Sequence, residues 1–375
     1  MTDPRITQLA HTLLHHSTKL QPGEHLLIEA FDLPEAMVVA LIEGAKRLGA
    51  HPHVALRSGE VQRALLDGAD AEQLDTWAAN DLDRMKRMDA YIGMRGAHNS
   101  AELAGLSESD AQKHARLYQT PVHGEQRVKH TRWCVLRWPT PSMAQAAGRS
   151  TRDFEDFYFS VCNADYPAMA EAVKPLERRM AAAEHVRIVG PGDTDLSFSI
   201  AGVPAVACTG GHNVPDGECF SAPVAGSANG VIAFNTPTRY LGKPLDRVRL
   251  ELADGVVTRA TAAAGQEALD AILATDEGAR SFGEFAVGFH PVITEPMGDI
   301  LFDEKIGGSV HLALGRAYEA ANNGNRSDIH WDLVLIQDER RGGGELHLDG
   351  ELVRKDGLFV VEDLLGLNPG ELGKR

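Results

Sequence analysis

The first half of the chain alternates short apolar runs with amphipathic stretches. Residues 25–30 (HLLIEA) and 52–56 (PHVAL) have the composition of buried strands, and residues 34–49 between them have the pattern of a helix that ends at a glycine. A strand, a helix and a strand at this short spacing predict a βαβ unit with parallel strands. The same patterns predict a charged helical stretch near 59–87 and further strands at 90–94 and 132–138.

The second half has a different pattern. Residues 195–200 alternate apolar and polar side chains, which is typical of a half-buried antiparallel strand. Two segments place an Asp-Gly pair between strand-like runs, at Asp254-Gly255 and at Asp349-Gly350. This dipeptide favours the tight turn of a β-hairpin, so antiparallel hairpins are expected here.

This change of pattern predicts an α/β protein of two domains, and 375 residues are enough for two hydrophobic cores. Residues 1–180 would form a Rossmann-like parallel-sheet domain, and residues 181–375 a mixed α+β catalytic domain with antiparallel hairpins. The loop after the first strand reads EAFDLPEA and lacks GxGxxG, so a dinucleotide site is not expected. Neither GxxxxGK[ST] nor GxSxG occurs, which argues against a P-loop nucleotide hydrolase and a serine hydrolase.

Charge and cysteine content narrow the partners and the compartment. The formal net charge of −16 argues against nucleic acid and anionic membrane surfaces, since both require a basic footprint. The four cysteines form no CxxC pair, and scattered cysteines suit a reducing compartment. No secretory signal and no apolar run long enough to span a membrane is visible, so we expect a cytoplasmic protein.

Most polar residues that could carry chemistry lie after residue 210. His330 and Asp332 stand two apart at the start of an apolar run, so in a strand they share a face. Burying both costs free energy unless they pair with each other or bind a metal ion, and either arrangement would satisfy them. Glu284 stands at the start of another apolar strand, and Glu218 lies in a loop rich in Pro and Gly. Carboxylates at such positions are more often solvated than bound to a metal.

Two further residues stand in the segment LFDEKIGGSVHLALGRAY. His311 lies in a run of small residues that reads as helical, and Tyr318 follows seven positions later, which would place both on one helix face. Each alone is more often a packing residue than a catalytic one. Taken as a set, however, two glutamates, two histidines and one aspartate are the donor types that hold a pair of divalent cations.

The order of several motifs makes a family recognisable. GPGDTDLSFSIAG, NVPDGECFSAP, DEGARSFGEFAVG, LFDEKIGGSVHLALGRAY and GNRSDIHWDL follow one another along the chain. With the opening βαβ segment and the segment RWCVLRWPTPSMAQAAGRSTRDFEDFYFSVC, this order resembles the thermophilic aminopeptidase family, the dinuclear metallopeptidases of the aminopeptidase T, AmpS and PepS group.

The resemblance implies a ligand set and a reaction. It implies that two divalent cations (zinc, cobalt or manganese) are bound by Glu218, Glu284, His311, His330 and Asp332. With a water activated between the cations, the enzyme would remove N-terminal residues from short peptides.

The resemblance also implies roles for single residues and an assembly. Glu218 would accept the water proton, and Tyr318 would lie near the scissile carbonyl. The protein would be a homodimer whose C-terminal domain carries the site. Its partners would be short peptides with a free N-terminus, with neither nucleic acid nor membrane among them.

Two departures from the family pattern lie beside the predicted ligands. The segment 319–329 is shorter than in many relatives, and Leu333-Val334 replaces a motif that commonly has Met two residues after the aspartate. Two alternatives also stay open. A His, His, Asp triad would suit one non-haem iron, as in a 2,5-dihydroxypyridine ring-cleaving dioxygenase on the same scaffold, and the chain could be a non-catalytic oligomeric binding protein.

Overall fold

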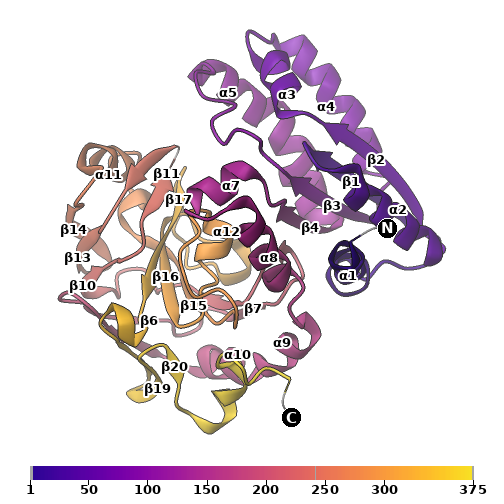
Figure 1. Cartoon of the computed structure of the whole chain (residues 1–375). Helices are drawn as coiled ribbons and strands as arrows, with labels where there is room; N and C mark the ends of the chain where they lie inside the picture. Colours follow the sequence, from indigo (N-terminus) through magenta and orange to yellow (C-terminus); the bar gives the residue numbers. More distant parts are fainter. Residues whose placement is uncertain (1–2, 241, 374–375) are drawn as a thin grey trace. The chain divides into compact units, whose positions relative to one another are not determined.

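The computed structural model describes residues 3–240 and 242–373, and the chain divides into two compact units (Figure 1). The first unit runs to Ala164 and also takes in Gly210–Val214, and the second contains the rest of the chain from Asp165. These units are defined by contacts within the chain. The domain limits of 1–180 and 181–375 stay a prediction. No helix in the described residues combines the length and the apolar character of a membrane span.

The first unit is built on a five-stranded parallel sheet of order β2-β1-β3-β4-β8. Its strands are β1 (His25–Phe31), β2 (His51–Arg57), β3 (Ala90–Arg95), β4 (Arg132–Arg137) and β8 (Asn213–Val214). Its helices are α1 (Pro4–Thr12), α2 (Glu35–Arg47), α3 (Gly59–Leu66), α4 (Ala71–Met85), α5 (Glu108–His114), α6 (Val128–His130), α7 (Pro141–Ala146) and α8 (Thr151–Cys162), with π-helical segments η1 (Leu13–Ser17) and η2 (Ala115–Arg127). The predicted βαβ opening is therefore confirmed.

The second unit contains an eight-stranded antiparallel sheet of order β14-β13-β10-β6-β5-β18-β19-β20. Its strands are β5 (His185–Val189), β6 (Asp195–Ser199), β10 (Asn229–Ala233), β13 (Arg249–Ala253), β14 (Val256–Thr261), β18 (Glu345–Leu348), β19 (Glu351–Lys355) and β20 (Leu358–Phe359). Both predicted hairpins are present. Asp254 and Gly255 at one turn, and Asp349 and Gly350 at the other, all have positive φ, as the tightest hairpin turns require.

Another sheet of the second unit has the order β17-β16-β15-β9-β7, and all its pairs are antiparallel. Its strands are β7 (Val206–Cys208), β9 (Glu218–Ser221), β15 (Phe282–Gly288), β16 (Ser309–Gly315) and β17 (His330–Ile336). The remaining elements are β11 (Thr238–Tyr240), β12 (Lys243–Leu245), α9 (Tyr166–Ala172), α10 (Lys174–Ala182), α11 (Gln266–Leu273), α12 (Ile300–Asp303) and the 3-10 turns η3 (Gly278–Arg280), η4 (Glu319–Ala321), η5 (Glu339–Arg341) and η6 (Glu362–Leu367).

The prediction of a helix around His311 is wrong, because residues 309–315 form the strand β16. Every residue of β16 is buried, and the strand pairs with β15 on one side and with β17 on the other. A strand buried on both faces loses the apolar–polar alternation that marks a half-exposed strand, so its sequence resembles that of a buried helix.

Candidate metal centre

Most of the predicted ligands lie on one face of the sheet β17-β16-β15-β9-β7, and the strand register shows why. Glu284 of β15, Ala313 of β16 and Asp332 of β17 are direct neighbours in one row across three strands. Residues opposite each other in an antiparallel pair point to the same face, and so do residues two apart in one strand. His311 and His330 therefore share the face of Glu284 and Asp332.

The fifth predicted ligand reaches the same face from the neighbouring strand. Glu218 of β9 pairs with Gly288, which stands four residues after Glu284 on β15. The opposite face is apolar and packs against the eight-stranded sheet, where the ring of Phe285 lies 5.1 Å from the ring of Phe198 on β6. The sheet thus separates a polar layer from an apolar layer.

Glu284 occupies the centre of the cluster. Its Oε1 atom lies 3.3 Å from Nε2 of His311, and its Oε2 atom lies 3.3 Å from Nε2 of His330. His330 Nε2 also lies 3.3 Å from Oδ1 of Asp332, and His311 Nε2 lies 3.5 Å from Oε2 of Glu218. The residues form two groups with ligand atoms within 4.8 Å, one of Glu218, Glu284 and His311 and one of Glu284, His330 and Asp332. The structure thus brings all five together, with Glu284 common to both groups.

Both imidazoles are oriented by backbone carbonyls. Nδ1 of His311 lies 3.2 Å from the carbonyl oxygen of Glu304, and Nδ1 of His330 lies 2.7 Å from the carbonyl oxygen of Arg316. A carbonyl oxygen only accepts hydrogen bonds, so each Nδ1 carries the proton. In the neutral imidazole, Nε2 then presents its lone pair to the cluster, which is the arrangement of a metal-binding histidine.

Two carboxylate oxygens of the cluster lack hydrogen-bond partners among the described residues, which bears on whether cations fit there. Oε2 of Glu218 and Oε2 of Glu284 are buried and accept no hydrogen bond from any residue that the structure describes. A buried carboxylate oxygen without a partner is costly, and a divalent cation would supply the missing partner. Glutamate, aspartate and imidazole are also the donors that zinc and manganese take. The residues present therefore fit divalent cations.

The pKa values of the cluster residues reflect the number of buried carboxylates around the two imidazoles. Burial lowers the pKa of both imidazoles, but the surrounding carboxylates outweigh it and raise the pKa of His311 to about 9 and that of His330 to about 11. Burial raises the pKa of Glu218 to about 8. Burial also disfavours the charged form of Glu284, yet the neighbouring His311 and His330 lower its pKa. The cluster thus attracts positive charge.

Tyr318 reaches the site by a different route from the predicted one. It lies just beyond the end of β16, so it does not share a helix face with His311. Its ring lies 4.5 Å from the ring of His330 and 5.9 Å from that of Phe220, and 47% of the residue is exposed. The ring of Tyr318 therefore lies beside the cluster while part of the residue faces solvent.

The two departures from the family pattern also have defined places. Val334 pairs with His311, so the position at which we expect relatives to carry methionine stands on the face of the predicted ligands. The short segment 319–329 is fixed by amide side chains. Asn323 Nδ2 donates to the carbonyls of Pro223 and Phe282, at 2.7 and 2.8 Å, and Asn325 Nδ2 donates to the carbonyl of Gly315 at 2.7 Å.

Sequence reasoning missed four residues beside the predicted ligands: Cys208, Asp216, Glu304 and Lys305. Glu304 forms a group with His311 and Asp332 whose ligand atoms also lie within 4.8 Å, so it is a further residue that could hold a cation. The signal was present, because the adjacent charges of Glu304 and Lys305 interrupt the apolar runs ILF and IGG. Nothing local in the sequence shows that these charges are buried.

Fold and site together define a two-unit α/β protein whose second unit carries a cluster of carboxylates and histidines with the donor types of a metal site. The chain belongs to the thermophilic metalloprotease (M29) family, whose family model matches residues 2–359. It is therefore a member of a hydrolase family, and the family predicted from the motif order is confirmed.

The relatives cover the chain to different extents. Aminopeptidase T of Thermus thermophilus is 28% identical over 92% of this chain and 94% of that protein. Aminopeptidase 2 of Geobacillus stearothermophilus is 34% identical, but the match spans only 39% of this chain and 37% of that protein.

Two solved structures share the fold. The wild-type AmpT structure from Thermus thermophilus matches with a TM-score of 0.80 at 23% identity, covering 96% of this chain and 99% of that one. The 2,5-dihydroxypyridine dioxygenase of Pseudomonas putida KT2440 matches with a TM-score of 0.61 at 14% identity, covering 96% and 98%. The predicted α/β fold class, with a parallel sheet and antiparallel hairpins, is confirmed.

Proposed function

We propose that this protein is an aminopeptidase that removes N-terminal residues from short peptides with the help of two divalent cations, zinc, cobalt or manganese. The observation that carries the proposal is the position of Glu284. This residue directs one carboxylate oxygen to each of two imidazoles whose Nδ1 atoms are held by backbone carbonyls. A carboxylate shared by two donor groups suits a pair of cations rather than a single one. Membership of a metalloprotease family and the similarity to proteins named aminopeptidases support the same conclusion.

The two donor groups would divide the cations between them. Glu218, Glu284 and His311 would hold one, and Glu284, His330 and Asp332 would hold the other. Bound there, divalent cations would lower the pKa of a water molecule and polarise the scissile carbonyl.

Two residues would act on the reacting groups. Glu218 would accept a proton from water and pass it to the leaving amine. Tyr318 would donate a hydrogen bond from its hydroxyl to the developing oxyanion.

The test is reconstitution of the metal-stripped protein with zinc, cobalt or manganese, followed by assays of leucyl-p-nitroanilide and of a dileucine peptide. We expect hydrolysis to rise with metal content up to about two ions per chain, and an N-acetylated peptide to resist cleavage. Glu284→Gln should lose both metal ions and activity. Failure of the fully loaded protein to cleave any unblocked peptide would contradict the proposal.

The same preparation distinguishes the dioxygenase alternative. A ring-cleaving dioxygenase of the mononuclear type would retain about one iron per chain and consume 2,5-dihydroxypyridine with oxygen. A non-catalytic binding protein would show neither reaction. The cytoplasmic location and the homodimer stay predictions, which cell fractionation and light scattering would test.

A further inference from the structure

Lys305 is a buried lysine whose ammonium group lies among carboxylates. The residue is 1% exposed. Its Nζ atom lies 2.5 Å from Oε1 of Glu218, 2.8 Å from Oε1 of Glu304 and 3.6 Å from Oδ1 of Asp216. The contacts with Glu218 and Glu304 are within hydrogen-bond distance, and Asp216 adds a longer ion-pair contact to the same ammonium group. Lys305 therefore occupies a fixed position at the edge of the predicted metal centre.

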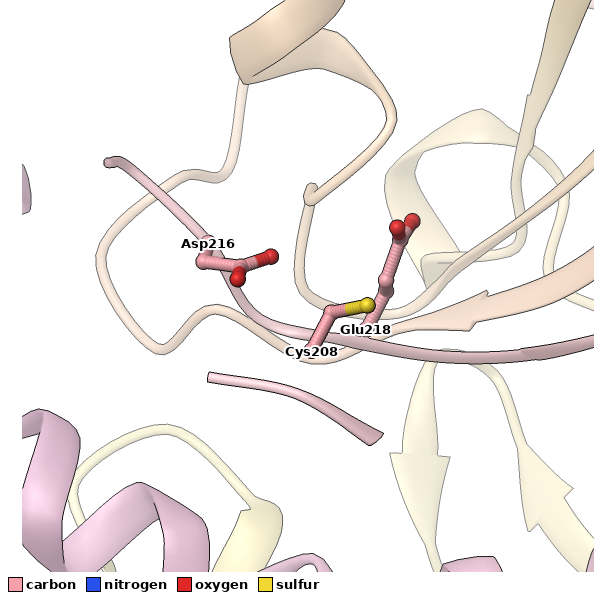
Figure 2. Close-up of side chains that lie close together, drawn as sticks. All are labelled: Cys208, Asp216 and Glu218. Carbon is pink, nitrogen blue, oxygen red and sulfur yellow. The ribbon is translucent and has the colours of Figure 1, made fainter. Parts of the chain in front are cut away.

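The position next to Lys305 has the donors of a metal site. Cys208 Sγ, a carboxylate oxygen of Asp216 and one of Glu218 lie within 4.8 Å of one another. Figure 2 shows the Asp216 carboxylate directed toward Cys208 and Glu218, with the sulfur on the side of Glu218. One thiol and two carboxylates could hold a transition-metal ion. In this structure the ammonium of Lys305 supplies the positive charge there instead.

Counting charges gives the ammonium group a definite role. When all five carboxylates of the cluster are ionised to bind cations, they carry five negative charges, and Lys305 carries one positive charge. With neutral imidazoles, two divalent cations complete electrical neutrality. The carboxylates are those of Asp216, Glu218, Glu284, Glu304 and Asp332. Without the lysine, the same pair of cations would leave one negative charge uncompensated in a buried site, which is costly.

We propose that Lys305 is a built-in third cation that limits this centre to two divalent ions. It fills the position that Cys208, Asp216 and Glu218 would otherwise offer to a metal ion. It also binds one oxygen of Glu218, so that the other oxygen, Oε2, faces His311 and the predicted cations. Lys305 is thus a positioning residue, and its role rests on the cation pair of the proposed function.

The experiment measures metal stoichiometry on the full-length, metal-stripped chain. Wild type should bind about two zinc ions, whereas Lys305→Ala, which removes the charge and opens space, should bind a third. With cobalt in place of zinc, that third ion should give a thiolate-to-cobalt charge-transfer absorption in the near ultraviolet. The absorption should be absent from wild type and from the double variant Lys305→Ala/Cys208→Ser.

A second variant keeps the test decisive if Lys305→Ala does not fold. Lys305→Gln retains a long polar side chain but not the charge. This variant lacks the positive charge that repels the cation pair. Its weaker zinc site should therefore bind zinc at least about tenfold more tightly than the same site in wild type. Lys355→Gln, at an exposed lysine of β19, is the matched control and should leave zinc affinity unchanged.

The outcomes separate this inference from the proposed function. Suppose that wild type and both Lys305 variants each bind two zinc ions with the same affinity. The role proposed for Lys305 would then be wrong, while the proposed pair of metal ions would be supported. Three zinc ions in wild type would also overturn it. A wild-type chain that binds no zinc would contradict the proposed function and this inference together.

Discussion

The aromatic ring of Tyr318 lies 4.5 Å from the imidazole of His330, although the two residues belong to different segments of the chain. Nδ1 of His330 is bound to the carbonyl of Arg316, two residues before Tyr318. One hydrogen bond therefore links the orientation of a predicted metal ligand to the backbone that carries the tyrosine. The ring of Tyr318 lies beside the cluster, and Tyr318 is not one of the predicted donors.

Replacing Tyr318 with Phe should lower kcat on leucyl-p-nitroanilide by about a hundredfold, since one hydrogen-bond donor to the oxyanion is lost. KM and zinc content should stay within about twofold of wild type. The control is Tyr118→Phe in the first unit, which removes a hydroxyl bonded to Asp81 and should leave kcat unchanged. Full activity in Tyr318→Phe would refute the role of its hydroxyl.

Ala313 stands between Glu284 and Asp332 in the row across β15, β16 and β17, and it is fully buried. Its methyl side chain points to the face of the predicted ligands. Ala313→Val should add bulk on that face and lower zinc affinity by at least about tenfold without removing any donor. Competition with a chromophoric chelator measures the change.

The control for this change lies on the opposite face of the same strand. Val310→Ile adds bulk to the apolar layer, where it should lower stability by about 1–3 kcal/mol while zinc affinity stays unchanged. Equal zinc affinity in Ala313→Val and wild type would show that the row does not border the cations.

Gly315 ends β16 with a φ of +100°, and a Cβ atom there would lie 2.2 Å from the carbonyl oxygen of Ile329. Gly315→Ala should lower the free energy of unfolding by about 2–4 kcal/mol, from the strained φ and the backbone clash together. Gly370 has a φ of +79° and open space around it, so Gly370→Ala should cost only about 1 kcal/mol. Urea unfolding at constant zinc concentration compares them, and equal losses would show that the clash is relieved.

The first unit should lose stability in acid through His123. Burial, together with the charge of Arg127, lowers the pKa of this imidazole to about 4. Because the unfolded chain takes up the proton near pH 6.5, stability is complete above that pH and falls as the pH drops toward 4, by up to about 3 kcal/mol. His123→Gln should remove this loss, as measured by urea unfolding at pH 7 and pH 4.5.

His130→Gln, at an exposed histidine, is the matched control and should keep the acid sensitivity of wild type. If His123→Gln and wild type lost the same free energy between the two pH values, another group would be responsible.

The parts of the fold that follow from local sequence were predictable. The strand at 25–30, the helix after it and the hairpin turns at Asp254-Gly255 and Asp349-Gly350 each depend on a few consecutive residues. The helical interpretation of residues 309–315 failed because a strand buried on both faces carries no alternation.

The gathering of the site residues depends on strand pairing over long sequence distances. The pairing of β9 with β15 joins residues almost seventy positions apart, and no spacing rule expresses it. The resemblance to a known family supplied the ligand set that single-residue reasoning left open. Lys305 escaped both approaches, since a lysine in a charged segment has the same appearance in the sequence whether it is solvated or buried.

The row of Glu284, Ala313 and Asp332 also determines how the centre responds to a change of chain length. Successive side chains of a strand point to opposite faces. One residue inserted between Ser309 and His311 would turn His311 into the apolar layer, and a hydrophobic neighbour would replace it among the carboxylates. Evolution can therefore exchange side chains around this centre far more easily than it can add or remove a residue within its strands.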